Sequence, residues 1–359
     1  MAEGWYGVVA FMLIVFAVLE GWDFGAGAVH LLVARTPSER NQVVEAIGPL
    51  WVWHEVWLVG AGGVLLMAFP SVMATAFSGY YMALYLVLWC LLLRGIALEF
   101  GRHLADGMWT AFWDVVFSCS SVLLALLFGI AFGNLVRGVP LGADGRFVMS
   151  LFTDFSPYGT VGILDWYTVS VGVLTLVLLM AHGASYLALR TNTVVCQRSR
   201  GLTGWMWPSA GILLVLVTWE TWTIRPDLFT MATHRPIVWG ATLVVAAGAG
   251  TLVTGKRQWR DDLHFLGSAL IIMGLLTGAF AALYPDMLHS TIGEQYSLTA
   301  PGQAAGHEGL VIAVVWWPIS LVAAVVYGAF NIRGHLGRIG ADTDATRVHG
   351  NESRGGWDS

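Results

Sequence analysis

Charged residues are scarce in this chain. Asp, Glu, Lys and Arg make up 11% of its 359 residues, whereas apolar letters make up 57%. A soluble globular domain carries about 25% charged residues, so this composition excludes that class. The basic residues are scattered without forming a cluster or stripe, which excludes a nucleic-acid-binding surface. The composition indicates an integral membrane protein.

Cysteine is also scarce. Cys90, Cys119 and Cys196 fall in two predicted spans and one loop, without CxxC or CxxCH spacing. This pattern excludes a disulfide framework, a zinc site and covalently attached c-type haem, and it predicts reduced structural thiols. The N-terminal sequence lacks a basic segment and a small-residue cleavage site, so we assign Tyr6–Leu19 to the first membrane span and not to a cleaved signal peptide.

Windows of about 20 apolar residues predict nine membrane-spanning helices and an all-α polytopic fold. The predicted spans are Tyr6–Val33, Ala46–Met67, Tyr80–Phe100, Phe112–Leu135, Trp166–Leu189, Met206–Thr223, Pro236–Thr254, Phe265–Leu283 and Leu310–Ile332.

The longest connection between spans divides the chain into two parts. It predicts a first four-helix bundle with buried acids in residues 1–136, an extracytoplasmic connection in residues 137–162, and a second four-helix bundle with one peripheral helix in residues 163–335. Residues 336–359 are polar and are expected to form a disordered cytoplasmic tail.

The distribution of Lys and Arg predicts the orientation, because cytoplasmic loops are enriched in these residues. Alternate loops and the tail on one side hold 13 of the 18 basic residues, the other side holds four, and Arg94 lies inside the third span. We therefore expect the N-terminus outside and the C-terminus in the cytoplasm.

Ionisable residues inside the predicted spans lie at similar depths. Glu20 and Asp23 are three residues apart and share one face of the first span, Glu55 lies in the second, and Arg94 lies in the third. A charge at the bilayer centre costs roughly 2.5–3.5 kcal/mol, so these four should face one another or water. Short loops place consecutive helices side by side, which makes the four residues neighbours.

Three carboxylates beside one guanidinium leave at least one acid without a cationic partner, and such an acid can carry protons. Arg94 is the charge partner, and a purely structural Arg94–Glu55 pair stays open as an alternative. The proton-path candidates are Glu20, Asp23, His54, Glu55 and Asp114.

His54 and His182 are also candidate haem or quinone contacts, although a single helical histidine is more often a hydrogen-bonded structural residue. No metal site is predicted. In the second half, Glu220 lies within reach of Arg225. Close helix contacts are predicted at small residues, namely Gly25, Gly27, Gly60, Gly62 and Gly63.

Seven sequence blocks carry a family resemblance. They are LEGWDFGAG (19–27), GPLWVWHEVWLVGAGGVLLMAFP (48–70), AFSGYY (76–81), RGIALEF (94–100), FGNLVRGVP (132–140), AHGASYLALRT (181–191) and YPDMLHSTI…YSLT (284–299). In order and spacing these blocks resemble subunit II of the cytochrome bd-type quinol oxidases, and the resemblance extends to about Arg338.

The resemblance implies a subunit without its own haem that forms a heterodimer with a subunit I carrying b-type and d-type haems. The family's complex lies in the bacterial cytoplasmic (inner) membrane, oxidises quinol and reduces dioxygen to water with cytoplasmic protons. Subunit II supports assembly and, in parts of the family, lines a proton-intake path and holds a structural quinone. Small accessory subunits are further expected partners.

The chain departs from the family in the second span, where it reads WVWHEVWL against the family's WDGNEVWL. Val52 stands where the family has an aspartate assigned to proton intake. Either Glu20, His54 and Glu55 carry the path, or protons enter through the partner subunit, or the complex does not reduce oxygen. Ala300–His307 also replaces an Asn- and Ser-rich stretch before the last helix.

Two other functions stay open from the sequence. One is a proton- or ion-conducting subunit of a different membrane redox complex, and the other is an independent transporter that uses the buried charges. The sequence shows no inverted repeat and no paired broken helices, which disfavours the transporter.

Overall fold

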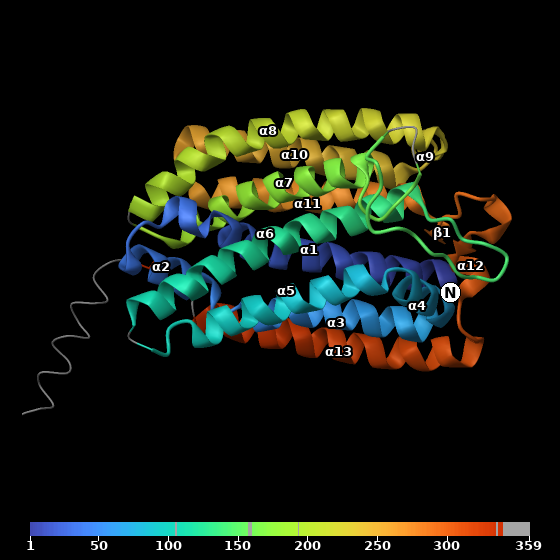
Figure 1. The fold of residues 1–359 in the computed structure, drawn as a ribbon, viewed down its shortest axis with the longest axis horizontal. Coiled ribbons are helices and arrows are strands. Elements are labelled where there is room, and N and C mark those ends of the chain that lie inside the picture. Colours follow the sequence, from blue (N-terminus) through green and yellow to red (C-terminus); the bar gives the residue numbers. More distant parts are fainter. Residues whose placement is uncertain (105, 157–159, 193, 335–336, 340–359) are drawn as a thin grey trace, which may run out of the picture.

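The computed structural model describes residues 1–104, 106–156, 160–192, 194–334 and 337–339. Figure 1 shows long helices that run side by side along the longest axis of the molecule. The tail predicted for residues 336–359 lies outside the described residues, except for residues 337–339.

Nine helices in the described part of the chain are long and apolar enough to cross a membrane. This confirms the predicted all-α polytopic fold. The nine are α1 (Ala2–Val33), α3 (Trp51–Ala68), α5 (Tyr81–Phe100), α6 (Gly107–Arg137), α7 (Trp166–Arg190), α8 (Val194–Ile224), α10 (Pro236–Gln258), α11 (Asp261–Leu283) and α13 (His307–Gly334).

Shorter elements cover the two ends of the helix array (Figure 1). The end that carries α2 (Pro37–Ile47) is named the α2 end, and the opposite end, which holds the N-terminus, is named the α9 end. β1 pairs with β2 in antiparallel orientation. The short elements after α3 are α4 (Pro70–Gly79), α9 (Pro226–Thr233), β1 (Asp286–Leu288), the 3-10 helix Glu294–Tyr296, β2 (Leu298–Thr299) and α12 (Ala300–Gln303).

The predicted span Ala46–Met67 is not one helix, because α2 ends at Ile47 and α3 begins at Trp51. Hydropathy does not detect this break. Pro49 lies between the two helices, and proline has no backbone N–H with which to continue a helix.

α2 begins with a capping box formed by Thr36 and Glu39. Glu39 also accepts hydrogen bonds from the backbone N–H of Arg35 at 2.6 Å and from Arg198 at 2.8 Å. These hydrogen bonds hold the pKa of Glu39 below its usual value, and the bond from Arg35 has the largest effect. α2 is therefore fixed both to its own first turn and to α8.

α8 begins at Val194, twelve residues before the predicted start at Met206. The first turns of α8 contain Arg198 and Arg200, so a hydropathy window excludes them although they are helical. Cys196 consequently lies in a helix and not in the predicted loop.

α1 is the central helix, with α3 and α6 packed on it from the first half of the chain and α7 and α11 from the second. Glycines permit its closest contacts. A Cβ atom at Gly25 would overlap the backbone of Leu179, one at Gly183 would overlap the backbone of Gly25, and one at Gly27 would overlap Ser121. The predicted close contacts at Gly25 and Gly27 are thus confirmed.

Of the other predicted glycine contacts, the structure shows the one at Gly60 but not those at Gly62 and Gly63. Gly60 faces the side chain of Met12, but nothing described lies within 4 Å of a Cβ built at Gly62 or Gly63. The prediction is wrong at these two positions within this chain, because they turn away from α1 toward the outer side of α3.

The helices form one connected array. α5 packs on α6, α6 on α7, α7 on α8, α10 on α11, and α13 on α3. Because α1 touches helices of both halves, the division into two four-helix bundles plus a peripheral helix stays our proposal.

At the α9 end, Arg225 pairs with a different acid from Glu220, the residue that the sequence placed within its reach. Glu220 accepts a hydrogen bond from Ser170 at 3.2 Å, while Arg225 pairs with Asp227 at 2.7 Å. The hydrogen bonds from Arg225 hold the pKa of Asp227 below its usual value. No Glu220–Arg225 ion pair forms within the described chain, because Asp227 at the start of α9 occupies the guanidinium.

Candidate functional site

Five ionisable side chains meet inside the helix array on α1, α3 and α5. We name them the acid cluster. Apart from Glu55, whose side chain is 29% exposed, all of them are fully buried. The structure therefore brings together all the predicted proton-path candidates except Asp114. The members of the acid cluster are Glu20, Asp23, His54, Glu55 and Arg94.

Arg94 lies at the centre of the acid cluster. Its Nη1 donates to Oε1 of Glu20 at 2.6 Å and lies 3.8 Å from Oε1 of Glu55, and its Nη2 lies 3.6 Å from Oδ2 of Asp23. The guanidinium also stacks over Phe24, 5.0 Å from the ring centroid. One permanently charged group thus serves three carboxylates.

His54 joins the cluster through Asp23. Its Nδ1 lies 2.6 Å from Oδ2 of Asp23 and 3.9 Å from Oε2 of Glu20, and the Trp22 ring meets it edge-on. Four buried acceptor atoms of the acid cluster have no hydrogen-bond partner among the described residues: Nε2 of His54, Oε2 of Glu20, Oδ1 of Asp23 and Oε1 of Glu55. Each of these atoms can accept a proton.

The acid cluster has more negative than positive groups. With all three acids ionised, two negative charges are uncompensated when His54 is neutral and one when it is protonated. Burying an uncompensated charge costs several kcal/mol. The arrangement therefore favours a bound proton, and it can pass that proton between side chains on α1 and α3.

The same group includes a possible set of metal ligands, because single ligand atoms of Glu20, Asp23 and His54 lie within 4.8 Å of one another. However, Arg94 already places a fixed cation against Glu20 and beside Asp23. A metal ion there would be repelled by the guanidinium, so the absence of a metal site stays our prediction.

Asp114 lies in a separate network at the α2 end. Its Oδ1 accepts from Arg102 at 2.6 Å and lies 3.2 Å from Nε2 of His30, while its Oδ2 accepts from Arg40 at 3.1 Å. His30 is seven residues beyond Asp23 on α1, about 10 Å along the helix. Two guanidinium donors stabilise the ionised carboxylate, so Asp114 is suited to anchor the α2 end.

His182 is also outside the acid cluster. Its Nδ1 is hydrogen-bonded to the Ser268 hydroxyl at 2.6 Å and its Nε2 to the carbonyl of Val18 at 3.1 Å, and its ring stacks on Phe265. Because both ring nitrogens are occupied, the geometry favours the structural role over haem or quinone ligation.

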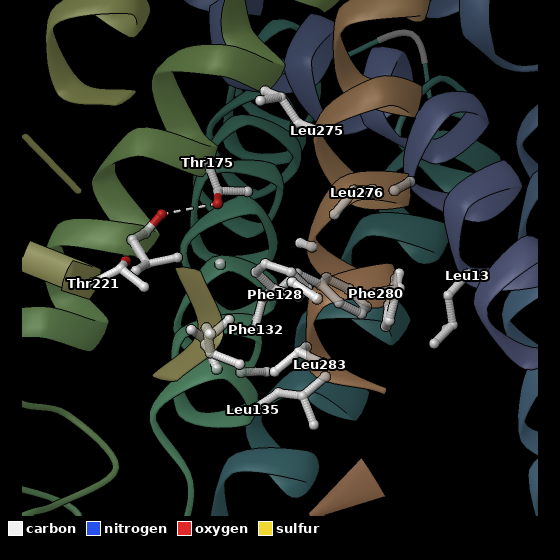
Figure 2. Close-up of a pocket in the computed structure, with 18 of the residues that line it drawn as sticks. Leu13, Phe128, Phe132, Leu135, Thr175, Thr221, Leu275, Leu276, Phe280 and Leu283 are labelled. Carbon is white, nitrogen blue, oxygen red and sulfur yellow. Dashed lines mark hydrogen bonds between the residues drawn. The ribbon is translucent and has the colours of Figure 1, made fainter. Parts of the chain in front are cut away.

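A large apolar cavity of about 580 Å³ lies toward the α9 end, between α1, α6, α7, α8 and α11. Figure 2 shows Phe128, Phe132 and Phe280 pointing into it from α6 and α11. Polar groups are few, and they include the Tyr167 hydroxyl, which is hydrogen-bonded to Thr221 at 2.9 Å. No sequence motif predicts this cavity, because its apolar lining comes from many separate elements.

Comparison with known proteins identifies the family. The model of the cytochrome bd terminal oxidase subunit II family matches residues 1–333. The chain belongs to this family. Its curated relatives include cytochrome bd-I ubiquinol oxidase subunit 2 of Escherichia coli strain K12, which is 34% identical and aligns over 96% of this chain and 97% of the relative.

Further relatives extend the match. The probable cytochrome oxidase subunit 2 of Haemophilus influenzae is 26% identical over 94% of this chain and 95% of its own length. A chain of the bd oxidase from Geobacillus thermodenitrificans has a similar fold, with a TM-score of 0.65, 14% identity, and coverage of 92% of this chain and 96% of that one.

Family membership confirms the resemblance seen in the sequence blocks, and it places the chain among the subunits of membrane-bound terminal oxidases. The alternatives of an unrelated redox complex or an independent transporter are not favoured, because the match covers nearly the whole chain.

We expect Asp114→Asn to destabilise the chain by about 1.5–3 kcal/mol, since hydrogen bonds to charged groups contribute this much and their guanidinium partners would lose an anion. Thermal unfolding of the purified complex in detergent measures the effect. Asp262→Asn is the matched control, because the Asp262–Arg260 pair is exposed and should contribute nothing measurable. Equal stability of both variants would contradict the anchoring role of Asp114.

Proposed function

We propose that this chain is the non-haem subunit of a bd-type quinol:dioxygen oxidoreductase and supplies part of the cytoplasmic proton path for water formation. The observation that carries the proposal is the acid cluster, in which three carboxylates and a histidine surround one buried guanidinium. A structural ion pair needs one acid for each base. Proton transfer needs more proton-accepting groups than fixed positive charges, and the acid cluster has this excess.

The proposed orientation places the α2 end in the cytoplasm of a bacterial cell, with the chain in the inner membrane. The basic residues support this, because the α2 end carries most of the Arg side chains and the sole lysine. The N-terminus and α9 would then lie outside.

A proton entering from the α2 end first meets the Asp114 network, which places His30 beside α6. From His30 to Asp23 the distance along α1 is about 10 Å, which requires relay through bound water. Within the acid cluster, protons move among Glu20, Asp23 and His54 by contacts that the side chains already make.

Glu55 is the proposed exit of the path. It is the one member of the acid cluster with an exposed side chain, and its neighbours Val52 and Val56 on α3 are also exposed. This outer surface of α3 is where we propose that the haem-bearing subunit I packs in the heterodimer and receives protons.

We propose that the path is kept although Val52 replaces the aspartate. Its side chain is 48% exposed, so it lies on the outer side of α3, whereas His54 is fully buried in the acid cluster. An aspartate at position 52 would therefore lie at the surface beside Glu55. Of the three possibilities that the sequence leaves open, we propose the first, in which Glu20, His54 and Glu55 carry protons.

Cofactors and partners follow from the same proposal. Subunit I would carry the b-type and d-type haems and oxidise the quinol, and this chain would support its assembly. Small accessory subunits are further proposed partners.

The apolar cavity fits a structural quinone. Its volume of about 580 Å³ lies within the usual range for organic ligands, and its aromatic and aliphatic lining suits a quinone ring and an isoprenoid tail. The hydroxyl of Tyr80 lines the cavity and has no hydrogen-bond partner among the described residues, so it is the group best able to donate to a quinone carbonyl. This binding would hold α1, α6, α7 and α11 together and needs no redox role.

We expect Glu20→Gln to lower oxygen-consuming turnover of the complex roughly tenfold or more, with haem content unchanged, because the amide cannot take up the proton. Oxygen consumption and the reduced-minus-oxidised haem spectrum measure the two quantities. Glu220→Gln is the control, since this buried acid on α8 lies outside the cluster. Unchanged turnover in Glu20→Gln would exclude its proton role, and loss of haem would indicate a structural role.

We expect Leu276→Trp to reduce the quinone extracted per purified complex, because Leu276 lines the cavity and the larger side chain fills it. Leu266→Trp, on the exposed side of the same helix, is the control and should leave the quinone content unchanged. Equal quinone content in both variants would show that the quinone binds elsewhere.

A further inference from the structure

A second pocket, which shares no lining residue with the acid cluster or the apolar cavity, lies at the α2 end between α7, α8, α10 and α11. It has a volume of about 580 Å³, and we name it the Lys256 pocket. Unlike the apolar cavity, it is lined by charged and polar side chains. Those that matter here are Arg200, Thr203, Lys256, Trp259, Asp261 and His264.

The Lys256 pocket has an excess of positive charge. Its single acid, Asp261, is buried and already neutralised, because Arg200 binds both of its oxygens at 2.9 and 2.7 Å and Arg338 adds a third bond at 3.0 Å. Two guanidinium groups against one carboxylate leave one positive charge, and Lys256 adds a second.

Lys256 has no ion-pair partner among the described residues. It is also the only lysine in the chain. Its Nζ lies 3.4 Å from the point where a Cβ of Gly204 on α8 would lie, so its ammonium extends across the pocket from α10 toward α8. A cation that spans a pocket without an acid partner is available to an anion.

His264 gives an independent indication of a ligand. This side chain lines the pocket, is 8% exposed, and its Nε2 is buried without a hydrogen-bond partner among the described residues. Buried polar atoms are rarely left unpaired in proteins. An acceptor or donor inside the pocket would satisfy it.

The surroundings of the pocket are those of a membrane interface. Trp259 and Trp205 are largely exposed, as tryptophans at the level of lipid head groups are, and the exposed Val253 continues the apolar surface of α10. Trp259 adopts a left-handed φ of 57°, which is unfavourable for a bulky residue, and its ring lies over Arg200 at 5.5 Å. The ring therefore lies beside the cations at one side of the pocket.

We propose that the Lys256 pocket binds the phosphate head group of an anionic phospholipid. Lys256 and the free Nη1 of Arg200 would hold the phosphate, and His264 would bond a head-group oxygen. Basic pockets between membrane helices on the cytoplasmic side bind such head groups. The apolar surface of α8 and α10 beside the pocket gives the acyl chains a place to lie, which free phosphate does not need.

The test uses the side-chain amine of Lys256, the only lysine in this chain. The complex is placed in nanodiscs of phosphatidylcholine, with or without phosphatidylglycerol, and acetylation of Lys256 by acetic anhydride is followed by peptide mass spectrometry. The Arg257→Lys variant supplies an internal control, because position 257 is adjacent in sequence but does not line the pocket.

Phosphatidylglycerol should slow acetylation at Lys256 roughly fivefold, as expected for one basic residue interacting with an anionic lipid, and should hardly change the rate at position 257. Inorganic phosphate in phosphatidylcholine nanodiscs should not protect Lys256. Equal slowing at both positions would overturn the proposal in favour of general surface charge, and so would no slowing. Protection by inorganic phosphate alone would overturn the lipid assignment.

Native mass spectrometry gives a second measurement. Lys256→Gln should lose the preferential retention of phosphatidylglycerol over phosphatidylcholine, and Lys256→Arg should keep it. Retention by Lys256→Gln at the level of the unmodified complex would contradict the proposal. Because the labelling experiment keeps Lys256 in place, it does not depend on how well this variant folds.

Discussion

The ion pair between Arg94 and Glu20 is the interaction on which the interior of this protein depends. Both side chains are fully buried in helices that cross the membrane, so neither charge can be exposed to lipid without a large cost. Pairing them fixes α5 against α1. The same guanidinium lies 3.6 Å from Asp23 and 3.8 Å from Glu55, and its single positive charge cannot neutralise all three carboxylates. The site therefore has more acids than bases.

The rest of the fold keeps this site closed and supported. Glycines on α1 and α7 bring their backbones into contact on the side of α1 that carries the second half of the chain. The Asp114 network holds α1, α2 and α6 at the α2 end, about 10 Å from Asp23. The buried polar groups are thus concentrated in the acid cluster and in the Asp114 network, while apolar side chains face the membrane and line the large cavity.

Much of this was predictable because the membrane restricts what a sequence can form. Apolar runs predicted nine spans, and the cost of isolated charges predicted that Glu20, Asp23, Glu55 and Arg94 would meet. The pairing of Asp114 with Arg40 was not predictable, because Arg40 lies in a connection between spans and arginines in such connections indicate only orientation. Hydropathy likewise missed the break at Pro49 and the polar start of α8, and the cavity depends on packing that no local pattern records.

The central claim is that the acid cluster holds an exchangeable proton at neutral pH. Infrared spectroscopy of the purified complex tests it most directly, because a protonated carboxyl has a C=O stretch separate from that of a carboxylate. We predict such a band, a shift of the band in deuterium oxide, and its loss in Asp23→Asn or Glu20→Gln. A spectrum in which neither substitution changes the carboxyl C=O region would contradict the account and leave the cluster as a set of structural ion pairs.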